Sequence, residues 1–256
     1  MNTKHFIVNN YKKDRRGKMD KKGLIRQIIL VSDGESNVGI NPIEVSKKAK
    51  ELGITVSTIG IVNNRTKEKP LAEIQQIANQ GGGIWEITDL ENFSKTMEML
   101  TVKTVHKTIQ EAVNKELKNI LGEGLEDFNP ESRRKIIDVI DKFGEEVDIR
   151  CCIVIDLSGS MTNKISIAKK SIVNLLRTLK QRKGKTEIAV IGFPGTDYEF
   201  YKTICDFTED IDELQKSLSN IATGGTTPTG PALKRAVEML LGTAEVNKGM
   251  LAANIV

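Results

Sequence analysis

The 256-residue sequence is poor in the residues that build many familiar sites and scaffolds. It contains two histidines, three cysteines and one tryptophan, and aromatic residues make up only 4%. With His5 and His106 as the only histidines, zinc binding and a Ser-His-Asp mechanism are both disfavoured. Because the cysteine count is odd and Cys151 and Cys152 are adjacent on an expected strand, we predict buried free thiols. A reducing, cytoplasmic compartment fits this prediction.

Long apolar runs and nucleotide-binding loops are also missing. No stretch approaches the eighteen or so apolar residues of a membrane helix, so we expect no membrane span. The N-terminus is charged and lacks the apolar stretch of a signal peptide. Gly184-Lys185-Thr186 has Leu179 where a phosphate-binding loop needs glycine, and Gly81-Gly82-Gly83 lacks the dinucleotide-binding spacing. We therefore expect a globular protein with one sizeable core, built from 39% apolar residues.

The positive charge is concentrated at the N-terminus. Residues 1–26 contain nine Lys or Arg and two Asp, a net charge of +7, whereas the whole chain carries +4. Basic character is thus a property of this end and not of the body of the protein. We expect residues 1–24 to form a flexible basic tail and 243–256 a C-terminal tail. We do not expect nucleic-acid binding.

The remaining sequence alternates between short apolar strands and amphipathic helices. This alternation predicts an α/β fold, a doubly wound and mostly parallel sheet with helices on both faces. One segment, 199–206, alternates polar and apolar residues after a turn at 194–197, as an antiparallel edge strand would. The expected strands are 27–32, 54–62, 84–88, 147–155, 186–193 and 199–206. The expected helices are 42–52, 71–79, one starting near 89, one following 130, 165–179, 211–221 and 230–241.

Hard oxygen ligands follow one of the buried strands. The apolar segment 151–155 leads directly into Asp156-Leu157-Ser158-Gly159-Ser160 and then into a helix. A carboxylate and two hydroxyls at alternate positions would lie at the carboxyl edge of the sheet, where open α/β sheets bind ligands. Such oxygens suit Mg²⁺ or Mn²⁺ better than a soft metal.

Two further motifs strengthen this interpretation. The glycine-rich segment 223–233 presents Thr227 just before an amphipathic helix, and the apolar strand 28–32 ends in Asp33-Gly34. Serine, threonine and aspartate also cap helices and tighten turns. Three such motifs, each placed after a strand or before a helix, favour a metal site over that simpler explanation.

Together the three motifs resemble the metal-ion-dependent adhesion site of the von Willebrand factor A (VWA) domain. The resemblance implies a VWA-like, Rossmann-type fold and a Mg²⁺ or Mn²⁺ ion that binds an Asp or Glu side chain of a protein partner. It implies a non-enzymatic interaction module. A regulatory subunit that docks on an AAA-type, chelatase-like ATPase is the alternative, and a metal-dependent hydrolase a weaker one. The implied metal ligands are Asp156, Ser158, Ser160, Thr227 and Asp33.

The motif order differs from that of an ordinary VWA domain, in which Asp-Gly comes last. Exchanging the two parts of the chain near residue 125 restores the family order, so we predict one circularly permuted domain over 25–242. Within it, 148–242 is the usual first half, 25–104 the usual second half and 105–147 a helical linker. This arrangement resembles small cytoplasmic VWA proteins of spore-forming bacteria, associated with sporulation. We favour a monomer over a swapped dimer, because tethered halves have a high effective concentration.

Overall fold

The computed structural model describes residues 23–62, 69–196 and 199–242. The strands follow the expected apolar runs closely. They are β1 (Leu24–Ser32), β2 (Ile54–Ile61), β3 (Gly82–Thr88), β4 (Asp148–Asp156), β5 (Thr186–Phe193) and β6 (Lys202–Thr208). The α-helices are α2 (Pro42–Glu51), α3 (Lys69–Gln80), α4 (Phe93–Leu121), α5 (Pro130–Glu146), α6 (Ile165–Leu179), α7 (Ile211–Ser219) and α8 (Thr229–Leu241), with short 3₁₀ turns at Leu125–Asp127 and Gly159–Met161.

All six strands belong to one sheet with the order β3-β2-β1-β4-β5-β6. The first five run parallel, and β6 pairs antiparallel with β5 at the edge. Strands β2 and β3, which follow β1, lie on one side of it, and strands β5 and β6, which follow β4, lie on the other, so the strand order reverses between these two central strands. Such a reversal point is where open α/β sheets bind their ligands.

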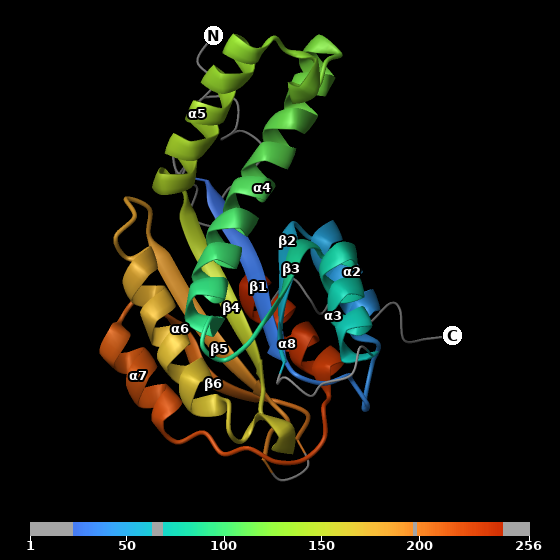
Figure 1. Ribbon diagram of the computed structural model, residues 1–256, viewed down its shortest axis with the longest axis vertical. Coiled ribbons are helices and arrows are strands. Elements are labelled where there is room, and N and C mark those ends of the chain that lie inside the picture. Colours follow the sequence, from blue (N-terminus) through green and yellow to red (C-terminus); the bar gives the residue numbers. More distant parts are fainter. Residues whose placement is uncertain (1–22, 63–68, 197–198, 243–256) are drawn as a thin grey trace.

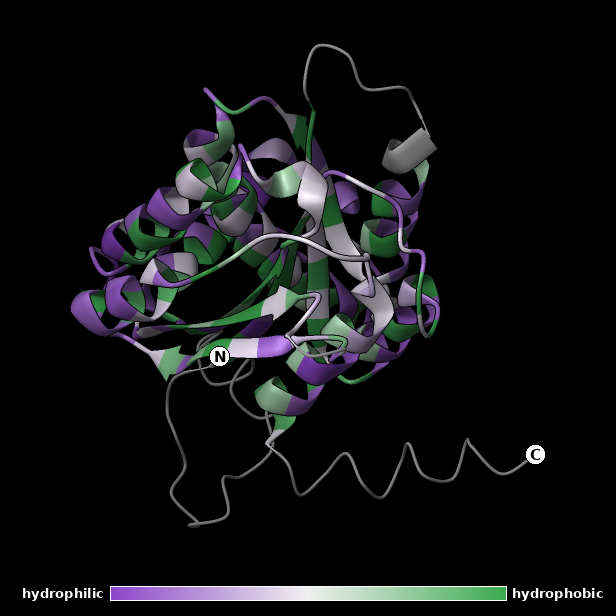
Figure 2. Cartoon of the chain, turned by 90° about the horizontal axis from the view of Figure 1, so that it is seen from below, coloured by the Kyte–Doolittle hydropathy of each residue, from purple (hydrophilic) through white to green (hydrophobic). Residues whose placement is uncertain are grey.

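Helices cover both faces of the sheet, as Figure 1 shows. On one face α4, α6 and α7 pack against residues such as Ile29 and Ile153, and on the other α2, α3 and α8 pack against residues such as Ile28 and Val154. The strands are mainly apolar along their length, and the helices turn polar faces outward (Figure 2). Alternate strand residues therefore supply two separate apolar layers, one on each side of the sheet.

Helices α4 and α5 form a hairpin that extends beyond the sheet at the top of Figure 1. Gly122, with a left-handed φ of 75°, ends α4, and the Asn129 side chain caps α5 by accepting the Ser132 N–H. Apolar residues pack between the two helices of the hairpin, among them Val113 of α4 and Ile140 of α5. None of the helices in the described residues has an apolar stretch long enough to cross a bilayer.

The expected α/β class and the antiparallel edge strand are confirmed, while two element boundaries differ. The expected helical linker, 105–147, begins within α4, which is one uninterrupted helix from Phe93 to Leu121. That helix begins at Phe93 and not near Asp89, because the Asp89 carboxylate holds Asn92 in a turn. The edge strand begins at Lys202, because Glu199 closes the preceding turn through backbone hydrogen bonds with Thr196 and Gly195.

The packing of α4 against the sheet can be tested with two neighbouring residues. Leu100 is fully buried in the core, whereas Met99 is 42% exposed. We expect Leu100→Ala to lower the free energy of unfolding by about 3 kcal/mol, through lost apolar contact and a residual cavity. Met99→Ala should change it by less than about 0.5 kcal/mol. Urea denaturation followed by circular dichroism measures both. Equal effects would contradict this packing of α4.

Candidate metal site

The strand register brings the predicted acidic residues to one edge of the sheet. Val31 on β1 pairs with Ile155 on β4, so the residues that follow them, Ser32 and Asp156, lie at the same level. The residues directly before these positions are apolar, 28–31 on β1 and 151–155 on β4, and each strand ends at its polar residue. The polar side chains at the ends of the two central strands therefore lie together at the reversal point of the sheet.

Asp156 is completely buried and firmly held. Its Oδ2 accepts a hydrogen bond of 2.6 Å from the Ser32 hydroxyl, and its Oδ1 accepts one of 2.8 Å from the Ser158 N–H. Burial raises the pKa of the Asp156 carboxyl above its usual range; the hydrogen bonds from Ser32 and Ser158 counter this, and the negative charge of Asp33 adds to it. A positive charge placed beside Asp156 would favour the ionised form.

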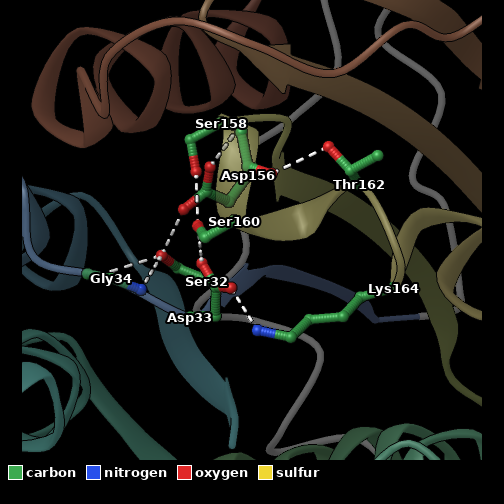
Figure 3. A network of polar contacts seen from close by, with 9 residues as sticks. Ser32, Asp33, Gly34, Asp156, Ser158, Ser160, Thr162 and Lys164 are labelled. Atoms are coloured by element: carbon green, nitrogen blue, oxygen red, sulfur yellow. Dashed lines mark hydrogen bonds and ion pairs between the residues drawn. The ribbon is translucent and has the colours of Figure 1, made fainter. Parts of the chain in front are cut away.

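A chain of hydrogen bonds continues from Ser158 to Asp33 (Figure 3). The hydroxyls of Ser158 and Ser160 lie 3.0 Å apart, and Ser160 donates to Asp33 Oδ1 at 2.7 Å. Ser160 and Asp33 are separated by 127 residues in the sequence. The structure thus brings four of the five predicted site residues into direct or successive contact.

Thr227 reaches the same edge through its backbone. Its N–H donates to the Asn37 side chain at 2.9 Å, and its carbonyl accepts from the Asn37 N–H and the Ser36 hydroxyl. The threonine loop is therefore fastened to the loop that follows Asp33. The Thr227 residue is buried, whereas Thr226 beside it is exposed.

The oxygen atoms of this cluster fit a small, hard cation. Neighbouring ligands of an octahedral Mg²⁺ ion at about 2.1 Å lie about 3 Å from each other, and the Ser158 and Ser160 hydroxyl oxygens have this spacing. Among the described residues, no group of three or more His, Cys, Asp or Glu side chains could hold a metal. A cation here would therefore meet two carboxylates and several neutral hydroxyls. Their roles as ligands remain predictions.

The cluster opens to solvent on one side. Ser158 and Asp33 are largely buried, but Ser160 and the neighbouring Gly159 are exposed. The glycine-rich segment 224–226 is also exposed, and the Gly224 N–H is bonded to the Leu157 carbonyl beside the cluster. Ser160, Gly159 and segment 224–226 therefore form the solvent-facing side of the cluster.

Two contributing residues were missed by the sequence analysis. Ser32 orients Asp156, and Lys164 forms an ion pair with Asp33 Oδ2. Ser32 lies directly before Asp33-Gly34, so its position gave a signal. Nothing in the sequence singles out Lys164; the structure places it at the N-cap of α6, where a small capping residue is expected and a positive charge is disfavoured.

Comparison with known proteins identifies the family. Residues 151–251 and residues 3–101 each match a sequence model of the von Willebrand factor type A domain family. The chain belongs to the VWA family, whose domains commonly carry a divalent-metal site and mediate protein–protein interactions. The two matched segments supply strands to the same six-stranded sheet.

Individual relatives support the assignment. The chain is 36% identical to the uncharacterized protein YabS of Bacillus subtilis over 233 residues, covering 90% of this chain and 94% of YabS. A crystal structure of an uncharacterized protein from Alicyclobacillus acidocaldarius superposes with a TM-score of 0.79 at 35% identity, covering 86% of this chain and 95% of that one. A 62-residue segment is 39% identical to the uncharacterized Escherichia coli protein YfbK, covering 23% of this chain and 11% of YfbK.

The close packing of Gly230 in α8 against the backbone of Ile40 can be tested by substitution. A Cβ atom at Gly230, in the first turn of α8, would overlap the carbonyl oxygen of Ile40, whereas nothing lies within 4 Å of one at Gly34. We expect Gly230→Ala to lower the free energy of unfolding by about 1–3 kcal/mol because backbone must move. Gly34→Ala should change it by less than about 0.5 kcal/mol. Urea denaturation of both variants distinguishes them, and a neutral Gly230→Ala would refute the close packing.

Proposed function

We propose that this protein binds Mg²⁺ or Mn²⁺ through Asp156, Ser158, Ser160, Thr227 and Asp33, and uses it to capture an Asp or Glu side chain of a protein partner. The observation that carries the proposal is the hydrogen-bonded chain from Ser158 through Ser160 to Asp33. It joins oxygen atoms from the two central strands at the exposed carboxyl edge of the sheet. Oxygens grouped in this way are suitable ligands for a hard divalent cation.

The proposed ligands fall into two groups, neutral and negatively charged. Ser158, Ser160 and Thr227 would offer neutral hydroxyl oxygens, while Asp156 and Asp33 would supply negative charge, in part through water. The Ser32 hydroxyl and the Ser158 N–H already hold Asp156 in one orientation. When bound, the cation would supply a Lewis-acidic centre with a coordination position free for a partner carboxylate. No general acid or base is needed for this role, and we propose binding and not catalysis.

We further propose that the domain is circularly permuted. The family matches at 3–101 and 151–251 are separate, yet both segments contribute to one sheet. Between them, α4 and α5 run from β3 to β4. Because Asp33 and Ser160 of the same chain are hydrogen-bonded, a second copy is not required to complete the site, which supports a monomer.

A cytoplasmic location is also part of the proposal. Cys151, Cys152 and Cys205 are free and buried, as expected where thiols stay reduced. Burial raises the pKa of Cys151 to about 12 and that of Cys152 well above its usual value, so neither thiol is poised for reaction. A sporulation-associated role remains a hypothesis based on the resemblance described above.

Metal binding can be tested at the buried aspartate. We expect Asp156→Asn to weaken Mn²⁺ binding at least tenfold, because the substitution removes one of two negative charges while keeping the side-chain volume. Electron paramagnetic resonance of free Mn²⁺ measures the affinity in the full-length protein. Asp138→Asn is the matched control, because Asp138 is exposed on α5, and it should leave the affinity unchanged.

Equal Mn²⁺ affinity in all three proteins would overturn the proposed site. Partner capture adds a second criterion: protein captured from a native lysate should be released by EDTA and absent with Asp156→Asn. Nucleotide turnover in a captured complex would instead favour the alternative of a subunit docked on an AAA-type ATPase. Metal-dependent hydrolysis by the isolated protein would favour the hydrolase.

The oligomeric state gives an independent prediction. We expect light scattering after size-exclusion chromatography to give the mass of one chain, 28.4 kDa, at micromolar concentration. The reason is that the tethered halves meet intramolecularly at a high effective concentration. A stable species of twice this mass would favour the swapped dimer.

A further inference from the structure

A buried lysine lies within the candidate metal site. Lys164 pairs with Asp33 Oδ2, and only 4% of the lysine side chain and 2% of the aspartate side chain are exposed. The same aspartate accepts the Ser160 hydroxyl at Oδ1, so its two oxygens serve different partners. Figure 3 shows the Lys164 side chain extended toward Asp33.

The position of Lys164 is unfavourable for a cation in two respects. It is the N-cap residue of α6, where the helix dipole is positive, and its ammonium group is removed from water. A lysine is retained in such surroundings when a negative charge compensates it. Asp33 is that charge, with Asp156 linked to it through Ser158 and Ser160.

The charges of the site follow from these contacts. With both carboxylates ionised, Asp33, Asp156 and the ammonium of Lys164 together carry one net negative charge. Without Lys164 the same ligand set would carry two. Because the site is largely buried, a charge of this kind acts more strongly on a cation than it would at the surface.

We propose that Lys164 is a resident cation that neutralises Asp33 and limits the affinity of the site for a divalent metal. This inference rests on the proposed function, since it concerns the same five ligands. Lys164 keeps Asp33 stably buried when no metal is bound, and it leaves a bound divalent ion only partly neutralised. Lys164 thus stabilises the metal-free site and lowers the affinity of that site for the metal.

The proposal predicts opposite effects on the metal-free and metal-bound protein. A neutral residue at position 164 leaves Asp33 buried without its counter-charge, so the metal-free protein should melt about 5–10 °C lower. The same change removes a repulsive charge from the neighbourhood of the metal, so Mn²⁺ should bind at least about tenfold more tightly. Mn²⁺ should then restore much of the lost thermal stability.

Two neutral variants separate charge from positioning. Lys164→Met removes both the charge and the bond to Asp33, while Lys164→Gln keeps a hydrogen-bond donor. If the charge limits affinity, both variants bind Mn²⁺ more tightly than the wild type. If Lys164 only holds Asp33 in place, Lys164→Met binds more weakly and Lys164→Gln restores wild-type affinity. Lys170→Met is the matched control, because Lys170 lies exposed on the same helix.

Electron paramagnetic resonance of free Mn²⁺ and thermal melts, with and without Mn²⁺, give the required measurements on the full chain. Tighter binding by Lys164→Met and Lys164→Gln, with Lys170→Met unchanged, supports the inference. Unchanged or weaker binding by both neutral variants overturns the inference about Lys164. If the wild type binds Mn²⁺ in that case, the proposed function still stands. Binding by the neutral variants but not by the wild type supports the inference and overturns the proposed function. Absence of binding in every protein overturns both.

Discussion

The hydrogen bond from Ser160 to Asp33 is the contact on which the candidate site depends. Each residue follows the end of a different central strand, and the two strands come from opposite halves of the sequence. The contact forms because β1 and β4 pair in parallel with a fixed register, and that register is set by apolar residues on both faces of the sheet. Core packing and site geometry are therefore consequences of the same strand pairing.

The site combines burial with low net charge. Asp156 receives hydrogen bonds from Ser32 and from the Ser158 backbone, and Asp33 receives them from Ser160 and Lys164. Buried carboxylates with such partners can be kept in one orientation before any ligand arrives. This preorganisation distinguishes the cluster from a set of serines and aspartates that merely cap helices.

Much of the architecture could be predicted from the sequence, because it depends on local patterns. Continuous apolar runs identify buried parallel strands, and the alternation in the last strand identifies an exposed edge. The family resemblance assigned Asp156, Ser158, Ser160 and Asp33 to one cluster, and the parallel pairing of β1 with β4 brings them together. The family resemblance supplied the order of the motifs and hence the expectation of a permuted chain.

The features that escaped prediction depend on contacts between distant residues. Lys164 looks like an ordinary surface lysine in the sequence, and its burial follows only from the position of Asp33, 131 residues away. The start of α4 was misplaced because the Asp89 carboxylate holds Asn92 in a turn just before the helix. The start of β6 was misplaced because Glu199 is used by the turn.

The central claim is that oxygen atoms from both halves of the chain surround one cation. Anomalous diffraction from crystals grown with Mn²⁺ tests it most directly. The account predicts a single strong peak bounded by the hydroxyls of Ser158, Ser160 and Thr227 and by the carboxylates of Asp156 and Asp33. A fully occupied peak elsewhere, or none at this cluster at saturating Mn²⁺, would contradict it.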